Sequence, residues 1–209
     1  MKNDCHICFL HIPKTGGMAV RNCLRNSFRG RFSPLVHRGK RKLSLTQRVL
    51  LATARKNKVV FALIREPFER LASAYFYLKN GATAHTDRDQ RDANRTVNLY
   101  RDLEHFIQEG LHIHMRKQVH LRPQTFWMRA RSKKKIEERW QLYDDIQLFR
   151  YEDMHTKFAV ELDKYKPIKP VFFRPKNVTR KKEKVVLSDE AKNIVYELYK
   201  QDYEIWKSL

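Results

Sequence analysis

The chain has 209 residues, 42% of them hydrophobic and 11% aromatic, and a formal net charge of +21 at pH 7. This composition excludes a disordered chain, its longest apolar runs are too short to cross a membrane, and three cysteines do not make a disulfide framework. The length predicts a single domain over residues 1–209. With no signal peptide ahead of the first strand-like run, we expect this domain in the cytoplasm.

The first half of the chain predicts strands and helices in alternation. Apolar runs give the strands, helical spacing of apolar residues gives the helices, and Pro67 suits a first helical position. The expected elements are a strand at 5–12, a helix ending at Gly30, a basic loop at 33–42, a helix from Ser44 to about Arg55, a strand at 59–64 and a helix from Pro67 to about Lys79.

The second half predicts fewer strands. The expected elements are a loop at 83–98, a short helix at 102–109 ending at Gly110, a helix at 133–140, a strand at 145–149, a helix at 153–165, a basic loop at 167–184 and a last helix capped by Ser188. The repeated strand–turn–helix order indicates an α/β fold with a central, mainly parallel sheet flanked by helices. Ligands of such folds bind at the carboxyl ends of the strands.

The first candidate site is the turn His11-Ile12-Pro13-Lys14-Thr15-Gly16-Gly17, which lies between an expected strand and an expected helix. Glycines let backbone N–H groups approach a ligand, the helix N-terminus adds partial positive charge, and Lys14 adds a full one. These features together predict an anion site. The spacing is not that of a Walker A loop.

The second candidate site is the segment Arg65-Glu66-Pro67-Phe68-Glu69-Arg70-Leu71-Ala72-Ser73. Arg65 leaves a strand at its carboxyl end, where a guanidinium can bind a phosphate with two parallel hydrogen bonds. Ser73 lies two turns into the following helix. Read alone, Arg65 pairs equally well with Glu66 or Glu69, and we expect Arg70 to be such a structural partner.

Together, the two segments resemble the phosphosulfate-dependent sulfotransferases, specifically the carbohydrate (heparan/chondroitin-type) branch whose loop reads HIPKTGG. Further similarity lies in Arg150–Asp153, in Asn177–Thr179 and in the last helix. The resemblance implies a P-loop-like three-layer fold and the donor 3′-phosphoadenosine 5′-phosphosulfate (PAPS). One departure stands out: Met18 follows the two glycines where the family usually has a hydroxyl residue.

The resemblance also implies roles for individual residues. Lys14, Thr15, Gly16, Gly17 and Met18 would bind the 5′-phosphosulfate, Arg65 and Ser73 the 3′-phosphate, and Thr179 and Arg180 the 3′-phosphate or adenine. His37, the histidine between the first helix and the second strand, would be the general base, with Glu152 as a weaker candidate. Lys14 would stabilise the leaving phosphate, so that no metal is required.

The expected reaction is sulfuryl transfer from PAPS to a hydroxyl group, on a carbohydrate that is itself possibly anionic. Two alternatives stay open: a nucleotide-dependent phosphoryl transferase, which would need Mg²⁺ held by a carboxylate, and a non-catalytic module that binds polyanions. Nucleic acid is not the expected partner, and no membrane span is expected.

Two other patterns are interpreted as structural. Cys5 and Cys8 lie within a predicted strand, unlike a redox pair at a helix start, and no second pair exists for zinc. His112, His114 and His120 lie among basic residues and are interpreted as a polar acceptor-side surface rather than as metal ligands.

Overall fold

The computed structural model describes residues 5–35, 58–80, 86–131, 140–142, 146–174 and 185–209. The chain divides into two compact units, and each is built from separate stretches of sequence. The sheet unit comprises Met1–Ile64, Gln124–Arg174 and Leu209, and the helical unit comprises Arg65–Pro123 and Pro175–Ser208.

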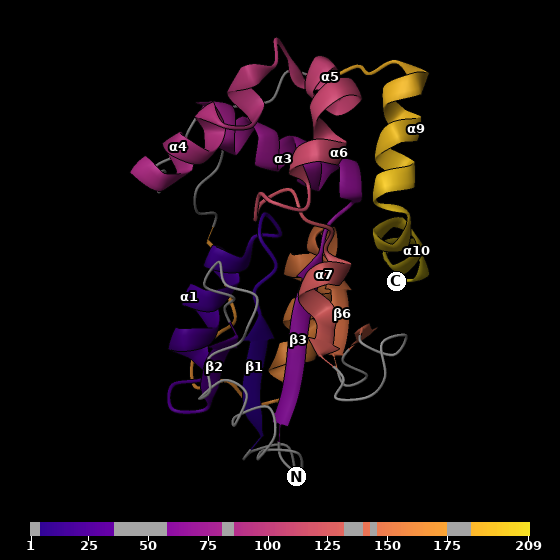
Figure 1. Cartoon of the computed structure of the whole chain (residues 1–209). Helices are drawn as coiled ribbons and strands as arrows, with labels where there is room; N and C mark the ends of the chain where they lie inside the picture. The colour runs from indigo at the N-terminus through magenta and orange to yellow at the C-terminus, as the bar shows by residue number, and fades with distance from the viewer. Residues whose placement is uncertain (1–4, 36–57, 81–85, 132–139, 143–145, 175–184) are drawn as a thin grey trace. The chain divides into compact units, whose positions relative to one another are not determined.

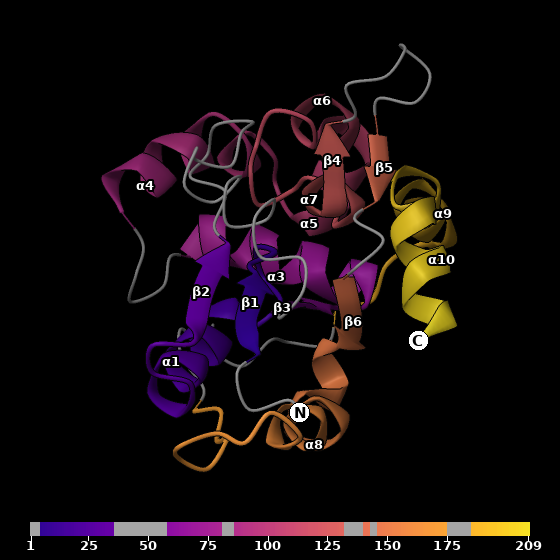
Figure 2. The same cartoon turned by 90° about the horizontal axis from the view of Figure 1, so that it is seen from below.

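A four-stranded sheet forms the centre of the sheet unit. Its order is β2 (Phe32–Leu35), β1 (His6–Leu10), β3 (Lys58–Ile64) and β6 (Ile146–Arg150), and Figures 1 and 2 show these strands. All three pairings are parallel, which confirms the predicted α/β fold with a parallel sheet. Leu10 pairs with Ala62, and Ile64 pairs with Arg150, so the carboxyl ends of three strands meet at one edge.

The two central strands are buried on both faces, as expected for parallel strands. Ile7, Cys8 and Phe9 of β1 are all fully buried. On the face that carries Phe9 and Phe61, helix α1 (Gly17–Ser27) and the segment that leads into α8 (Ala159–Asp163) supply the partners. The Phe61 and Phe158 rings meet edge to face, with centroids 5.6 Å apart.

Three predictions for the sheet unit need correction. The expected loop at 33–42 begins with β2, an edge strand whose Pro34 is tolerated because edge strands leave some N–H positions unpaired. The expected helix at 153–165 is a succession of a 3₁₀ turn (Tyr151–Asp153), a π turn (Met154–Phe158) and α8. The expected helix at 133–140 does not reach Trp140, which lies in β5 (Trp140–Leu142); residues 133–139 lie outside the described residues. Strand β5 pairs antiparallel with β4 (Arg129–Arg131), which follows α7 (Thr125–Met128).

The helical unit is built around a buried face of α3. Its elements are α3 (Pro67–Asn80), α4 (Asp87–Asn94), a 3₁₀ turn (Val97–Leu99), α5 (Leu103–His105), a π turn (Phe106–Gly110), α6 (Leu111–His114), α9 (Asp189–Leu198) and α10 (Lys200–Ser208). Pro67 is the first residue of α3, as predicted. Ser188 caps α9, also as predicted, since its Oγ accepts a hydrogen bond from the Ala191 N–H (3.3 Å).

Two predictions for the helical unit are wrong. The expected loop at 83–98 contains α4, which a reciprocal capping box between Thr86 and Asp89 begins. Gly110 does not end a helix, because the helical path continues through it to His114. A Cβ at this position would lie 2.3 Å from Cζ of Tyr100, so the glycine is needed for close packing and not as a stop signal.

In the part of the chain that the structure describes, no helix combines the length and the apolar character that a bilayer crossing requires.

Candidate anion-binding site

The turn after β1 has an alternating backbone conformation. Lys14 (φ 71°) and Gly16 (φ 73°) are left-handed, whereas Thr15 between them is not. A left-handed residue other than glycine is uncommon and costs free energy, so it marks a turn held by its surroundings. Thr15 helps to stabilise the turn, because its buried Oγ1 donates a hydrogen bond to the Ile12 carbonyl (3.0 Å). Alternating handedness turns successive N–H groups toward one side, the geometry of an anion-binding nest.

Both glycines of the turn are sterically required. A Cβ on Gly16 would lie 2.7 Å from Cε2 of Tyr151, and a Cβ on Gly17 would lie 2.1 Å from Cδ2 of His11. Tyr151 follows β6, two strands away from β1 in the sheet. The turn is therefore packed between a residue from its own strand end and a residue from another strand end.

The electrostatics of the turn favour an anion. Helix α1 begins with glycine at its N-cap, no side chain caps it, and its first turn contains no acidic residue. The first N–H groups of a helix have no partner within it and carry partial positive charge. Lys14, half-buried and two residues before the N-cap, adds a full charge. Met18 lies in the first turn of α1 and is 38% exposed.

The second candidate segment is the start of α3. Glu66 caps this helix, since its Oε2 accepts a hydrogen bond from the Glu69 N–H (2.6 Å). Arg65 donates to the carboxylate of Glu69 (3.2 Å), which is one of the two partners that the sequence left open. Ser73 is buried one turn beyond Glu69. Glu69 and Ser73, four residues apart, lie along one face of α3, and Arg65 precedes the helix by two residues.

Arg70 is a structural residue, but its partners differ from those expected. Its fully buried guanidinium donates to the carbonyls of His120 (3.1 Å) and Arg122 (2.6 Å) and lies over the Tyr199 ring. Burial lowers the pKa of Arg70, and the nearby Tyr199 and Asp202 oppose this shift. Arg70 thus anchors the segment before Pro123.

Each candidate segment directly follows a strand of the sheet. The Lys14 turn follows β1 and Arg65 follows β3, and these strands are parallel neighbours. Glu152 follows β6, which is the next strand at the same edge, and its side chain is exposed. His37, Thr179 and Arg180 lie outside the described residues, so their roles stay predictions. Tyr151 was not predicted, because only the strand order reveals that it faces Gly16.

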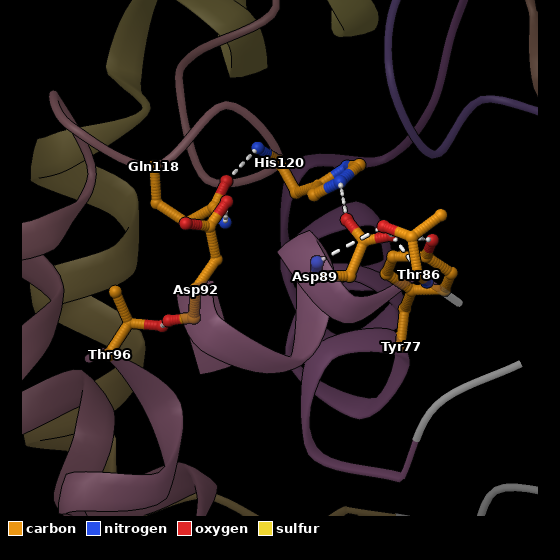
Figure 3. Close-up of polar contacts among 7 residues, drawn as sticks. All are labelled: Tyr77, Thr86, Asp89, Asp92, Thr96, Gln118 and His120. Atoms are coloured by element: carbon orange, nitrogen blue, oxygen red, sulfur yellow. Dashed lines mark hydrogen bonds and ion pairs between the residues drawn. The ribbon is translucent and has the colours of Figure 1, made fainter. Parts of the chain in front are cut away.

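The three histidines of the expected acceptor-side surface have different environments. His112 is exposed, and His114 Nε2 lies 3.2 Å from the hydroxyl of Tyr100. His120 Nε2 lies 3.6 Å from Asp89 Oδ1, in a polar cluster that Figure 3 shows. Among the described residues, no group of three potential metal ligands gathers.

Asp89 is the centre of that cluster. Its Oδ2 accepts hydrogen bonds from the Tyr77 hydroxyl (3.0 Å) and from both the N–H (3.0 Å) and the hydroxyl (2.8 Å) of Thr86 (Figure 3). His120 and these donors hold the pKa of Asp89 well below its usual range. The cluster therefore joins α3, the start of α4 and the segment after α6 through one carboxylate.

Cys8 is buried in β1 and Cys5 precedes the strand. Within the described residues, neither of them forms a disulfide bond. Burial raises the pKa of Cys8 to about 11, which keeps its thiol protonated and unreactive.

A family model described as the sulfotransferase family matches residues 1–207, a range that includes both candidate segments and both compact units. No curated protein and no solved structure matches the chain.

Proposed function

Because the chain belongs to the sulfotransferase family, we propose that it transfers the sulfuryl group of PAPS to a hydroxyl group of a carbohydrate. We further propose that the two compact units together act as one sulfotransferase domain over residues 1–209. The single observation that carries the proposal is the turn after β1. There, left-handed Lys14 and Gly16 precede a helix whose start has no acidic residue and no side-chain cap.

In this proposal, the Lys14 turn binds the 5′ end of the donor. Backbone N–H groups of Thr15, Gly16, Gly17 and Met18 receive the 5′-phosphate, and the ammonium of Lys14 neutralises charge on the bridging oxygen. A hydroxyl residue after the glycines would add a further donor. Met18 cannot supply one, so the backbone and Lys14 carry this end of the site.

The 3′-phosphate is assigned to Arg65 and Ser73. Arg65 offers a guanidinium just before α3, and Ser73 offers a hydroxyl within that helix. The salt bridge between Arg65 and Glu69 must open or rearrange when a phosphate binds. Thr179 and Arg180 are proposed as further contacts to the 3′-phosphate or to adenine.

The proposed reaction is an in-line displacement. The bond between sulfur and the bridging oxygen of the 5′-phosphate breaks as a bond forms between sulfur and the acceptor oxygen. The acceptor proton passes to His37, and the electron pair of the broken bond remains on the phosphate, whose charge Lys14 stabilises. A positioned general base contributes roughly 10²–10⁴-fold to such a rate. Glu152, at the carboxyl end of β6, is the second candidate for the base.

The proposed acceptor is a carbohydrate, possibly an anionic one. The net charge of +21 and the acid-free segment from Cys5 to Arg65 support this choice, because a basic field raises the encounter rate with anionic chains.

The test compares two lysines with the same backbone conformation. Lys14 and Lys166 are the described non-glycine residues with positive φ, so Ala at either position meets a similar backbone cost. Lys14→Ala should lower the turnover of sulfuryl transfer from PAPS by about 10²–10³-fold, as when a donor to a developing anion is removed. Lys166→Ala should retain the parental turnover. Parental turnover in Lys14→Ala would remove Lys14 from the mechanism.

Two measurements separate the alternatives. Calorimetry with 3′-phosphoadenosine 5′-phosphate should show one saturable site, whereas a polyanion-binding module would show only salt-sensitive binding to heparin or DNA. A phosphoryl transferase would lose its activity in the presence of a Mg²⁺ chelator, whereas the proposed sulfuryl transfer should not.

A further inference from the structure

The segment after α8 exposes two large apolar side chains from a firmly held backbone. Its ends are anchored in the core of the sheet unit by Tyr165 and Phe173, which are 4% and 1% exposed. Phe173 stacks on Phe158 with ring centroids 5.7 Å apart. Between these anchors, Ile168 is 61% exposed and Phe172 is 65% exposed.

Backbone hydrogen bonds fix this exposure. The Ile168 N–H donates to the carbonyl of Ser27 (2.8 Å), and the Ser27 hydroxyl donates to the carbonyl of Pro170 (3.4 Å). The Arg31 guanidinium donates to the Tyr165 and Lys166 carbonyls. Turning Ile168 inward would break the bond that joins the segment to the end of α1, so the outward apolar side chains are part of the fold.

Exposed cations flank the apolar pair along the chain. Lys166, Lys169 and Arg174 of the same segment are exposed, and so is Arg29, two residues after Ser27. The hydrogen bond between Ile168 and Ser27 joins two acid-free stretches, residues 164–174 and 5–65, and Figure 2 shows the segment after α8 beside α1. The nearest carboxylates along the chain belong to α8, where Glu161 is paired with Lys164 (2.7 Å) and Asp163 is exposed.

We propose that Ile168, Phe172, Lys166, Lys169, Arg174 and Arg29 form a docking surface for an anionic lipid bilayer. Ile168 and Phe172 enter the boundary between headgroups and acyl chains, and the four cations lie over the lipid phosphates and carboxylates. A soluble polyanion would satisfy the cations, but it offers no apolar phase to Ile168. A second copy of the chain would bring the same cations face to face, which opposes self-association. This inference is independent of the proposed function.

The test measures sedimentation of the full chain with vesicles of phosphatidylcholine alone and of phosphatidylcholine mixed with phosphatidylserine. The variant Ile168→Ser/Phe172→Ser removes the apolar pair without a change in charge. The matched control is Leu99→Ser/Val186→Ser, whose side chains are 62% and 80% exposed in the helical unit. Heparin binding, measured in parallel, reports the contribution of charge alone. Thermal unfolding verifies that all three proteins are folded.

The parental chain should bind the phosphatidylserine vesicles, and Ile168→Ser/Phe172→Ser should bind them at least about tenfold more weakly, because each lost side chain removes apolar burial. The control should stay within about twofold, as is usual for surface substitutions. Heparin affinity should be the same in all three. Equal vesicle binding by the parental chain and the Ile168/Phe172 variant, or no vesicle binding by the parental chain, would overturn the proposal. A parallel loss of heparin affinity in that variant would reassign the surface to a soluble polyanion.

Discussion

Replacement of Gly16 by alanine tests the geometry of the proposed donor site. Gly16 has φ 73°, and a Cβ there would lie 2.7 Å from Cε2 of Tyr151. Gly30 is a matched control, because it has φ 82° and no heavy atom within 4 Å of a Cβ. Gly30→Ala should therefore cost only the left-handed backbone term, about 1–2 kcal/mol. Gly16→Ala should cost this amount and a further ~1–3 kcal/mol of overpacking against the Tyr151 ring.

Thermal unfolding at neutral pH measures both costs, since each kcal/mol corresponds to a shift of about 2–4 °C for a chain of this size. Gly16→Ala should also weaken binding of 3′-phosphoadenosine 5′-phosphate in calorimetry, whereas Gly30→Ala should not. Tyr151→Ala supplies the decisive cross-check: in that background, Gly16→Ala should cost no more than Gly30→Ala. If Gly16→Ala and Gly30→Ala were equally destabilised in the parental background, the contact between Gly16 and Tyr151 would not be as described.

Three further predictions concern charged and titratable groups. Glu69→Gln should tighten binding of 3′-phosphoadenosine 5′-phosphate by up to about fivefold in calorimetry, because an exposed ion pair worth up to ~1 kcal/mol no longer competes for Arg65. Weaker binding in this variant would contradict the role of Arg65 at the 3′-phosphate. Folding lowers the pKa of Asp89. The Asp89 carboxylate therefore stabilises the folded state at pH values above its unfolded pKa of about 3.9. This stabilisation is lost as the pH falls toward the pKa of the folded state. Asp89→Asn should therefore lower the free energy of unfolding at neutral pH by about 1–3 kcal/mol. In a pH series of thermal unfolding, the stability of this variant should also fall less steeply toward acid pH than that of the parental chain. An equally steep fall would mean that groups other than Asp89 cause the acid sensitivity. His37→Ala should lower turnover by roughly 10²–10⁴-fold while calorimetric donor binding stays intact, and a loss of binding would instead make it a binding residue.

The two strand–turn–helix units could be predicted because local signals agree there. Apolar runs mark β1 and β3, glycines follow one strand and Pro67 follows the other, and the structure has the helices where these signals place them. The Lys14 turn and the start of α3 follow from the same signals. The choice between Glu66 and Glu69 for Arg65 depends on side-chain geometry, which the sequence does not contain.

Other features depend on contacts that are distant along the chain. Helix α4 is almost entirely polar, with Ala93 as its buried residue, so its apolar periodicity is absent and its capping box is the main local signal. Gly110 resembles a helix stop signal in the sequence, but the structure shows that a glycine is needed there because the Tyr100 ring leaves no room for a Cβ. Tyr151 is revealed as the wall of the Lys14 turn only by the order of the strands.

The buried Arg70 has a consequence for how the chain folds during synthesis. Its hydrogen-bond acceptors lie about fifty residues later, at His120 and Arg122. The ring and the carboxylate that accompany it come later still: Tyr199 lies between α9 and α10, and Asp202 lies in α10. A guanidinium without these companions is costly to bury, so α3 must remain partly hydrated until the segment that carries Tyr199 and Asp202 has been synthesised. Emergence of that segment, rather than formation of the first helices, is therefore the step that closes the helical unit.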